Sequence, residues 1–113
     1  AMHGARVQAS AELYMGLVEV GVGVIPAGGG CKELIARLKD PRRAFELIGQ
    51  AKVSGSAEEA RKWGFLSRSD RITMNQERLL ADAKALALSL VPDYTPGAPR
   101  WAGNLRRCCA AAD

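Results

Sequence analysis

The sequence predicts an α/β fold that is predominantly helical, with two or three short strands. Four segments show the apolar spacing and the capping residues of helices. A long glycine-rich stretch interrupts regular structure in the first third of the chain, and a short segment before it alternates polar and apolar residues as a strand does. With 113 residues, the chain can bury one modest core.

The first third is expected to contain little helix. Residues 6–10 form a candidate strand because apolar and polar side chains alternate there. Residues 15–25 are mostly apolar, but Gly16, Gly21 and Gly23 disfavour a regular helix. We therefore expect this stretch to be irregular or extended and to pack closely against other backbone.

Two helices are expected in the middle of the chain. Residues 31–39 are amphipathic, and Asp40 followed by Pro41 is a typical helix start for residues 41–48. The first helix should place Leu34, Ile35 and Leu38 on its buried face and Lys32, Glu33 and Arg37 on the opposite face. The second should bury Ala44, Phe45 and Ile48.

Two further helices are expected after a short link or strand at residues 52–55. Ser56 and Glu59 form a capping box, and the helix that they open should end near Gly64. Asn75 is placed to cap the longest helix, residues 76–91. Its apolar stripe, which could face the chain's own core or a partner subunit, comprises Leu79, Leu80, Ala83, Leu86, Ala87 and Leu90.

Composition and charge exclude several classes of protein. The net charge is +4, but basic and acidic side chains interleave along the helices, so we expect no nucleic-acid partner. No apolar run reaches the length of a membrane span, and no secretory signal is present, which predicts a cytoplasmic protein. One histidine, His3, to which we assign no role, and three cysteines without ligand spacing predict no metal site.

Glu19 is the candidate catalytic residue. Every other residue from 17 to 25 is apolar or glycine, and a carboxyl group in such surroundings loses hydration. This favours its protonated form near neutral pH and suits it for general acid–base catalysis. The alternative is an ordinary carboxylate that reaches solvent or pairs with an arginine.

The glycine turn at residues 26–30 is a second candidate. Glycines before a helix expose backbone N–H groups that can hold an anion or a water molecule, but the residues by themselves favour a tight turn that only permits close packing. The spacing is neither a Walker loop nor a dinucleotide fingerprint. Cys31 has no histidine nearby in sequence to act as its base, so we do not expect a nucleophile there, and Cys108 and Cys109 lie in the expected tail.

Three motifs in order resemble the enoyl-CoA hydratase/isomerase (crotonase) superfamily. Tyr14 and Gly16 precede Glu19, a Gly–x–x–Pro–x–x–Gly–Gly turn spans residues 23–30, and an Ala–x–x–x–Gly helix end occurs at residues 60–66. The resemblance extends over residues 2–96 and is strongest to the hydratase-like part of fused 3-hydroxyacyl-CoA dehydrogenase proteins. It implies a partial crotonase-type domain over residues 1–99, the C-terminal portion of the ClpP/crotonase-like fold, followed by a non-family, disordered tail at residues 100–113.

The resemblance also implies a chemistry. The parent enzyme would belong to fatty-acid β-oxidation and add water to an enoyl-CoA thioester, with Glu19 transferring the α-carbon proton and the backbone N–H of Ala27 holding the water. Family members often have glycine at the position of Ala27, so a positive φ there would strain this chain. The second glutamate and the oxyanion hole lie upstream in the family, so we expect this chain alone to be inactive.

The expected partners follow from these interpretations. The ligand of the parent enzyme is an acyl-CoA thioester, and this chain itself needs no cofactor. Exposed apolar helix faces predict a homo-oligomer. The alternative function is a non-enzymatic helical module for interaction or oligomerisation.

Overall fold

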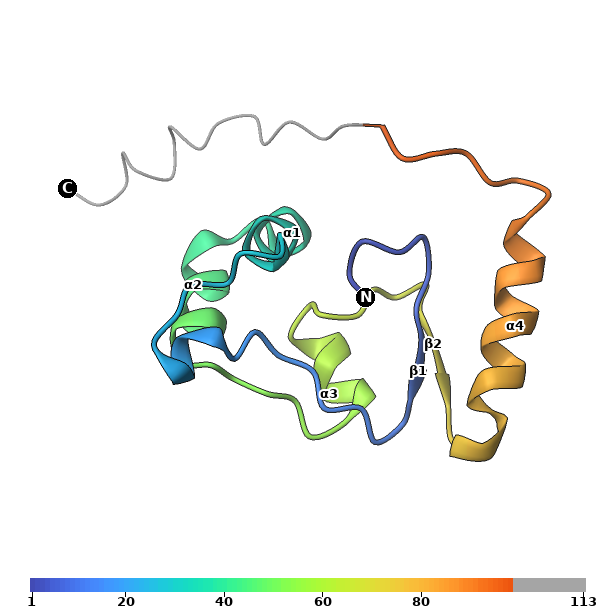
Figure 1. Ribbon diagram of the computed structural model, residues 1–113, viewed down its shortest axis with the longest axis horizontal. Helices are drawn as coiled ribbons and strands as arrows, with labels where there is room; N and C mark the ends of the chain where they lie inside the picture. The colour runs from blue at the N-terminus through green and yellow to red at the C-terminus, as the bar shows by residue number, and fades with distance from the viewer. Residues whose placement is uncertain (99–113) are drawn as a thin grey trace.

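The computed structural model describes residues 1–98, so the predicted tail at 100–113 lies outside the described part. Strand β1 (Gln8–Ser10) pairs in parallel with strand β2 (Arg71–Thr73), and Ala9 stands opposite Ile72. Figure 1 shows α4 on the far side of these strands from α1 and α2. The helices are α1 (Gly30–Leu38), α2 (Pro41–Gly49), α3 (Ala57–Lys62) and α4 (Leu79–Leu90), with 3₁₀ turns η1 (Glu19–Val22) and η2 (Gln76–Arg78). The prediction of a mainly helical α/β chain is confirmed.

The predicted capping residues begin their helices. Asp40 Oδ1 accepts a hydrogen bond from the Arg43 backbone N–H at 3.1 Å, and Ser56 Oγ accepts one from the Glu59 N–H at 3.1 Å. The Glu59 carboxylate reaches back to the N–H of Gly55, one residue before the cap, at 2.7 Å. These bonds satisfy backbone donors that the first turn of a helix leaves unpaired.

The longest helix begins differently from the prediction. The Asn75 side chain accepts a hydrogen bond from the Glu77 N–H, as a cap should, but the first turn that it opens is the 3₁₀ turn η2. The α-helix proper follows as α4. Tightened first turns of this kind are common at helix ends.

The core lies where α1, α2 and α3 meet the start of the chain. Ala44 and Leu47 of α2 are buried, whereas Phe45 is 76% exposed, so its predicted burial is wrong. The inward stripe runs through positions 44, 47 and 48, and Phe45 lies one residue off it. The buried apolar cluster comprises Met2, Ala9, Leu34, Ala44, Leu47, Ala57, Ala60, Phe65 and Leu66.

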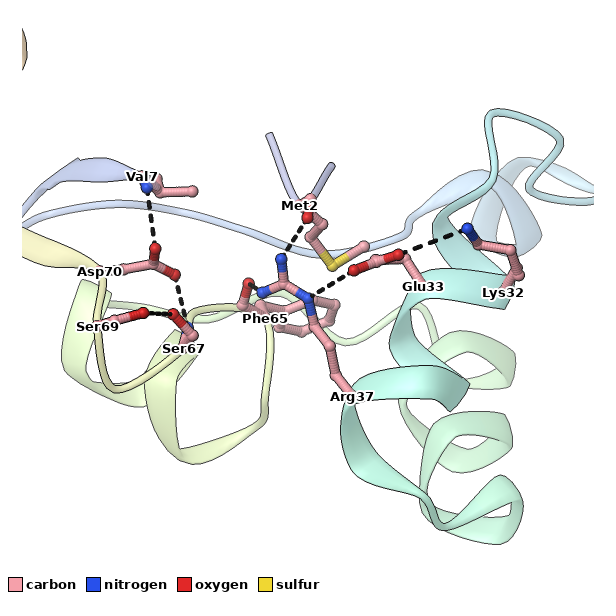
Figure 2. Close-up of polar contacts among 9 residues, drawn as sticks. All are labelled: Met2, Val7, Lys32, Glu33, Arg37, Phe65, Ser67, Ser69 and Asp70. Carbon is pink, nitrogen blue, oxygen red and sulfur yellow. Dashed lines mark hydrogen bonds and ion pairs between the residues drawn. The ribbon is translucent and has the colours of Figure 1, made fainter. Parts of the chain in front are cut away.

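The polar face of α1 is only partly solvated: Lys32 is exposed, but Glu33 and Arg37 are covered. Glu33 is only 6% exposed, and the Arg37 guanidinium bonds to Glu33, to the Phe65 carbonyl at 2.9 Å and to the Met2 carbonyl. Figure 2 shows the guanidinium reaching between the N-terminal segment and the loop after α3. Because these two segments cover the face, periodicity within α1 could not reveal its burial.

The apolar stripe of α4 serves the chain's own core only in part. The helix packs against β1, and Leu86 is its buried residue. Leu80, predicted in the same stripe, is 82% exposed, and Ala87 and Leu88 are exposed as well. A helix that is apolar on several sides normally has neighbours on more than one of them.

Candidate functional site

Glu19 begins the short 3₁₀ turn η1 between the first strand and the glycine turn. The backbone closes this turn on itself, because the Val24 N–H donates to the Glu19 carbonyl at 3.1 Å and Gly23 adopts a left-handed conformation with φ of 81°. The irregular stretch predicted at residues 15–25 therefore contains one defined turn. That turn fixes the backbone that carries the carboxyl group.

The Glu19 side chain is half-buried and not fully paired. Its Oε2 atom is buried, and no hydrogen-bond partner for it exists among the described residues. Burying a carboxylate oxygen without a partner is unfavourable, so such atoms are rare outside functional sites. This is the clearest chemical anomaly at a position that the sequence singles out.

Two glycines allow the segment before Glu19 to approach its neighbours. Gly16 pairs with Val53 in an antiparallel bridge, and a Cβ at Gly16 would lie 2.3 Å from the Lys52 carbonyl oxygen. A Cβ at Gly30 would lie 2.6 Å from the side chain of Leu17. The segment is thus held between the chain after α2 and the first residue of α1, as the predicted close packing requires.

The glycine turn leads from Glu19 into α1. Pro26 is buried, Ala27 and Gly28 are exposed, and Gly29 caps α1 in a left-handed conformation with φ of 85°. Ala27 is not among the residues with positive φ, so alanine fits this backbone without the strain that a left-handed position would impose. The Leu17 side chain lies against Gly30 and so connects this turn with the segment that carries Glu19.

Two side chains, those of His3 and Cys31, lie beside the turn. The His3 imidazole, to which the sequence assigned no role, lies 3.2 Å from where a Cβ of Gly29 would stand. The Cys31 thiol is half-buried and contacts the Pro26 carbonyl oxygen at 3.7 Å. Sequence reasoning could not have placed His3, because 26 positions separate it from Gly29 and no motif links them.

One hollow of the described chain lies apart from the Glu19 segment. It has a volume of about 590 Å³, and its lining includes Arg6, Lys32, Arg37, Ser67 and Asp70. Both oxygens of the Asp70 carboxylate are hydrogen-bonded, since Oδ1 accepts from the Val7 N–H at 2.9 Å and Oδ2 from the Ser67 N–H at 2.6 Å (Figure 2). Among residues 1–98, no three potential ligand side chains gather to hold a metal ion, and no helix is long and apolar enough to cross a membrane.

Comparison with known proteins identifies the arrangement. No family model matches the chain. A Bacillus subtilis protein described as a probable 3-hydroxyacyl-CoA dehydrogenase is 55% identical over 94 aligned residues, and the match covers 76% of this chain and 12% of that protein. A Rickettsia felis protein that carries the name of a fatty acid oxidation complex trifunctional enzyme is 33% identical over 93 residues, 78% of this chain and 13% of its own length.

A solved structure extends the likeness to three dimensions. An enoyl-CoA hydratase subunit from Geobacillus kaustophilus superposes with a TM-score of 0.68 at 28% identity, over 82% of this chain and 34% of that one. The chain belongs to the crotonase superfamily. It matches about an eighth of each curated relative and a third of the solved hydratase, so it corresponds to part of a crotonase domain. The relatives bear enzyme names, which favours the enzymatic interpretation over a non-enzymatic helical module.

Proposed function

We propose that this chain supplies the proton-transferring carboxyl group, Glu19, to an enoyl-CoA hydratase site of fatty-acid β-oxidation. The observation that carries the proposal is the buried, unpartnered Oε2 atom of Glu19, in a turn anchored beside the start of α1. The names of the relatives support the substrate class, an acyl-CoA thioester.

In the proposed reaction, water adds across the double bond of an enoyl thioester. The water oxygen bonds to the β-carbon, and a proton passes to the α-carbon as the double bond is lost. Glu19 donates the proton to the α-carbon, and the proton that the water loses passes to the second carboxyl group of the domain. The backbone N–H of Ala27, an exposed residue, donates a hydrogen bond to the water. These are positioning and proton-transfer roles, which in enzymes typically contribute 10²- to 10⁴-fold each when well aligned.

The described residues provide only part of such a site. A second carboxyl group and the donors that stabilise the thioester oxygen must come from the rest of a crotonase domain, and each such donor is worth about 3 kcal/mol in related chemistry. We therefore expect the 113-residue chain alone to show no turnover of crotonyl-CoA. A rate in the wild-type chain that falls in Glu19→Gln would contradict this expectation of inactivity while supporting the role of Glu19.

We further propose that the outer face of α4 mediates self-association. Leu80, Leu88 and Val91 are exposed there, and α4 is apolar on several sides. Sedimentation equilibrium should show a mass above the monomer that Leu80→Asp reduces; a monomeric wild-type chain at high concentration would contradict it. A cytoplasmic location remains a prediction from the sequence.

A further inference from the structure

The turn that carries Glu19 is not held in place by its own apolar side chains. None of the four residues of η1 is buried, and Val18 and Val24, which flank the turn, are 48% and 55% exposed. An apolar side chain stabilises a turn mainly by removing its surface from water. The position of the Glu19 carboxyl group therefore depends on contacts that other segments make with the backbone around it.

One such segment is the connection between α2 and α3, whose residues 51–54 we call the α2 link. It contacts the chain on both sides of the candidate carboxyl group. Before that group, Val53 forms the antiparallel bridge with Gly16. After it, the Ala51 methyl group lies 3.4 Å from where a Cβ of Gly21 would stand. The α2 link thus supports both ends of the segment that contains the turn.

Ser54 makes side-chain hydrogen bonds to the chain before the turn. It is completely buried, and its Oγ accepts from the Met15 N–H at 3.0 Å and donates to the Leu13 carbonyl at 3.3 Å. The Ser54 backbone N–H also donates to the Met15 carbonyl, at 2.9 Å. A hydroxyl that is used both as donor and as acceptor fixes the register of two neighbouring segments. Removing it would leave a half-buried backbone N–H without its acceptor.

Ala51 has a backbone conformation that is unusual for alanine. Its φ is 48°, in the left-handed region that glycine adopts without steric cost. The Ala51 N–H donates to the Ile48 carbonyl and the Lys52 N–H to the carbonyl of the buried Leu47, each at 3.0 Å, so the α2 link is tied directly to the end of α2. Backbone strain of this kind persists only where the surrounding contacts hold it. The methyl group that glycine would lack is the one that lies beside Gly21.

We infer that the α2 link sets the position of the Glu19 carboxyl group, with Ser54 and Ala51 as its positioning residues. Ser54 fixes the backbone before the turn, and Ala51 supports the turn itself. Catalytic groups have to be held within about 0.5 Å of their productive geometry by supporting contacts of this kind. The inference rests on the proposed function for the reaction that Glu19 serves, whereas the positioning is a property of the chain itself.

Two substitutions in the α2 link test the inference, each with a matched control. Ser54→Ala is compared with Ser56→Ala, which also removes the side-chain acceptor of one backbone N–H, but at the start of α3. Ala51→Gly is compared with Lys39→Gly, because Lys39 is the other non-glycine residue with a positive φ among residues 1–98 and lies at the end of α1.

Nuclear magnetic resonance of the full 113-residue chain gives two readouts at the turn. The first is the set of side-chain carbon chemical shifts of Glu19. The second is the exchange rate of the Gly21 and Val24 amide hydrogens, which bond to the Val18 and Glu19 carbonyls at 2.9 and 3.1 Å. Local opening speeds exchange at the turn alone, whereas a loss of global stability speeds it throughout the core. The urea unfolding midpoint of each variant separates these two causes.

We expect both link variants to shift the Glu19 resonances and to speed exchange at Gly21 and Val24 by about fivefold or more through local opening. The two controls should leave both readouts near their wild-type values. Ala51→Gly should act with an unfolding midpoint close to that of the wild-type chain, which a merely structural role would not produce.

If Ser54→Ala does not fold, Ala51→Gly and its control decide the question. Unchanged readouts in a folded link variant, or equal changes in the controls, would overturn the inference. A finding that Glu19 has no part in hydration would count against the proposed function instead, because these readouts need no turnover.

Discussion

The buried carboxylates of Asp70 and Glu33 differ in their hydrogen bonding from the carboxyl group of Glu19, the candidate site residue. Asp70 accepts hydrogen bonds from two backbone N–H groups and is 6% exposed. Glu33, equally buried, pairs with Lys32 and Arg37. Glu19 has a buried oxygen without a partner in the described chain. A carboxylate with both oxygens bonded holds chain segments together, whereas a buried oxygen without a partner marks a place where another group can bind.

The apolar side chains show the same division. Apart from Phe45, most of those of α1, α2 and α3 lie in or against one buried cluster, while the large apolar side chains of residues 18–25 are exposed. The helices bury their apolar stripes against one another within the chain. Residues 18–25 are equally apolar, but the described residues leave their large side chains exposed. Four substitutions can break or sharpen this comparison.

The largest effect is expected at Asp70. Asp70→Ala removes the acceptor of the Val7 and Ser67 N–H groups and leaves both donors without their partner beside the strand pair. We expect a loss of about 3 kcal/mol in the free energy of unfolding, because hydrogen bonds to a buried charge are worth about 1.5 to 3 kcal/mol each. Urea unfolding measures this free energy. A loss below about 1 kcal/mol would show that the Asp70 hydrogen bonds do not hold the start of β1 to the start of β2.

Gly16 should come next. Gly16→Ala places a Cβ 2.3 Å from the Lys52 carbonyl oxygen, so backbone must move, at about 2 kcal/mol, the usual range for overpacking. Gly28→Ala is the control, since no atom lies within 4 Å of its Cβ position. Thermal unfolding of both variants compares them. Equal melting temperatures would mean that the Gly16–Val53 bridge does not position the Glu19 segment.

Glu19 should behave in the opposite way to Asp70. Glu19→Gln replaces a carboxyl group whose buried Oε2 has no partner among the described residues by a neutral amide, so we expect stability to rise by up to about 1 kcal/mol. Glu46→Gln, on the exposed face of α2, should change it by less than about 0.5 kcal/mol. If Glu19→Gln instead destabilises the isolated chain in urea unfolding, Glu19 belongs with the structural carboxylates.

The smallest effect is expected at the end of α1. Lys39 caps α1 with a φ of 53°, a left-handed conformation that glycine adopts without steric cost. Lys39→Gly should therefore raise the free energy of unfolding by about 0.5 kcal/mol, the lower steric cost being offset in part by the entropy of the unfolded chain. Differential scanning calorimetry can resolve it; a clear loss would mean that the lysine side chain contributes contacts.

Local signals predicted much of this fold correctly. Asp40, Ser56 and Asn75 cap the turns that they were expected to cap, because a capping bond joins residues two or three positions apart. The β2 strand was not located in advance. Its three residues at 71–73 are too few for a clear alternation, and their pairing with β1 depends on a contact across 63 positions.

Burial was harder to predict than helix position. Phe45 is exposed and Glu33 buried, against the expectation from periodicity, because each depends on which other segment covers that side of its helix. For the candidate site, the sequence identified Glu19 and the glycine turn. It could not place His3 beside Gly29 or Leu17 against Gly30, since these contacts join residues without a common motif.

By itself, the sequence determined the helices, the caps and the ancestry of the chain, because these depend on spacing and on motifs within a few residues of one another. Only the tertiary structure decided which carboxylates are satisfied and which apolar residues are left uncovered. Hydrogen-bond saturation and burial are properties of segments that meet in space. A carboxylate at position 70 therefore joins the Val7 and Ser67 backbones, whereas the one at position 19 has a buried oxygen without a partner among the described residues.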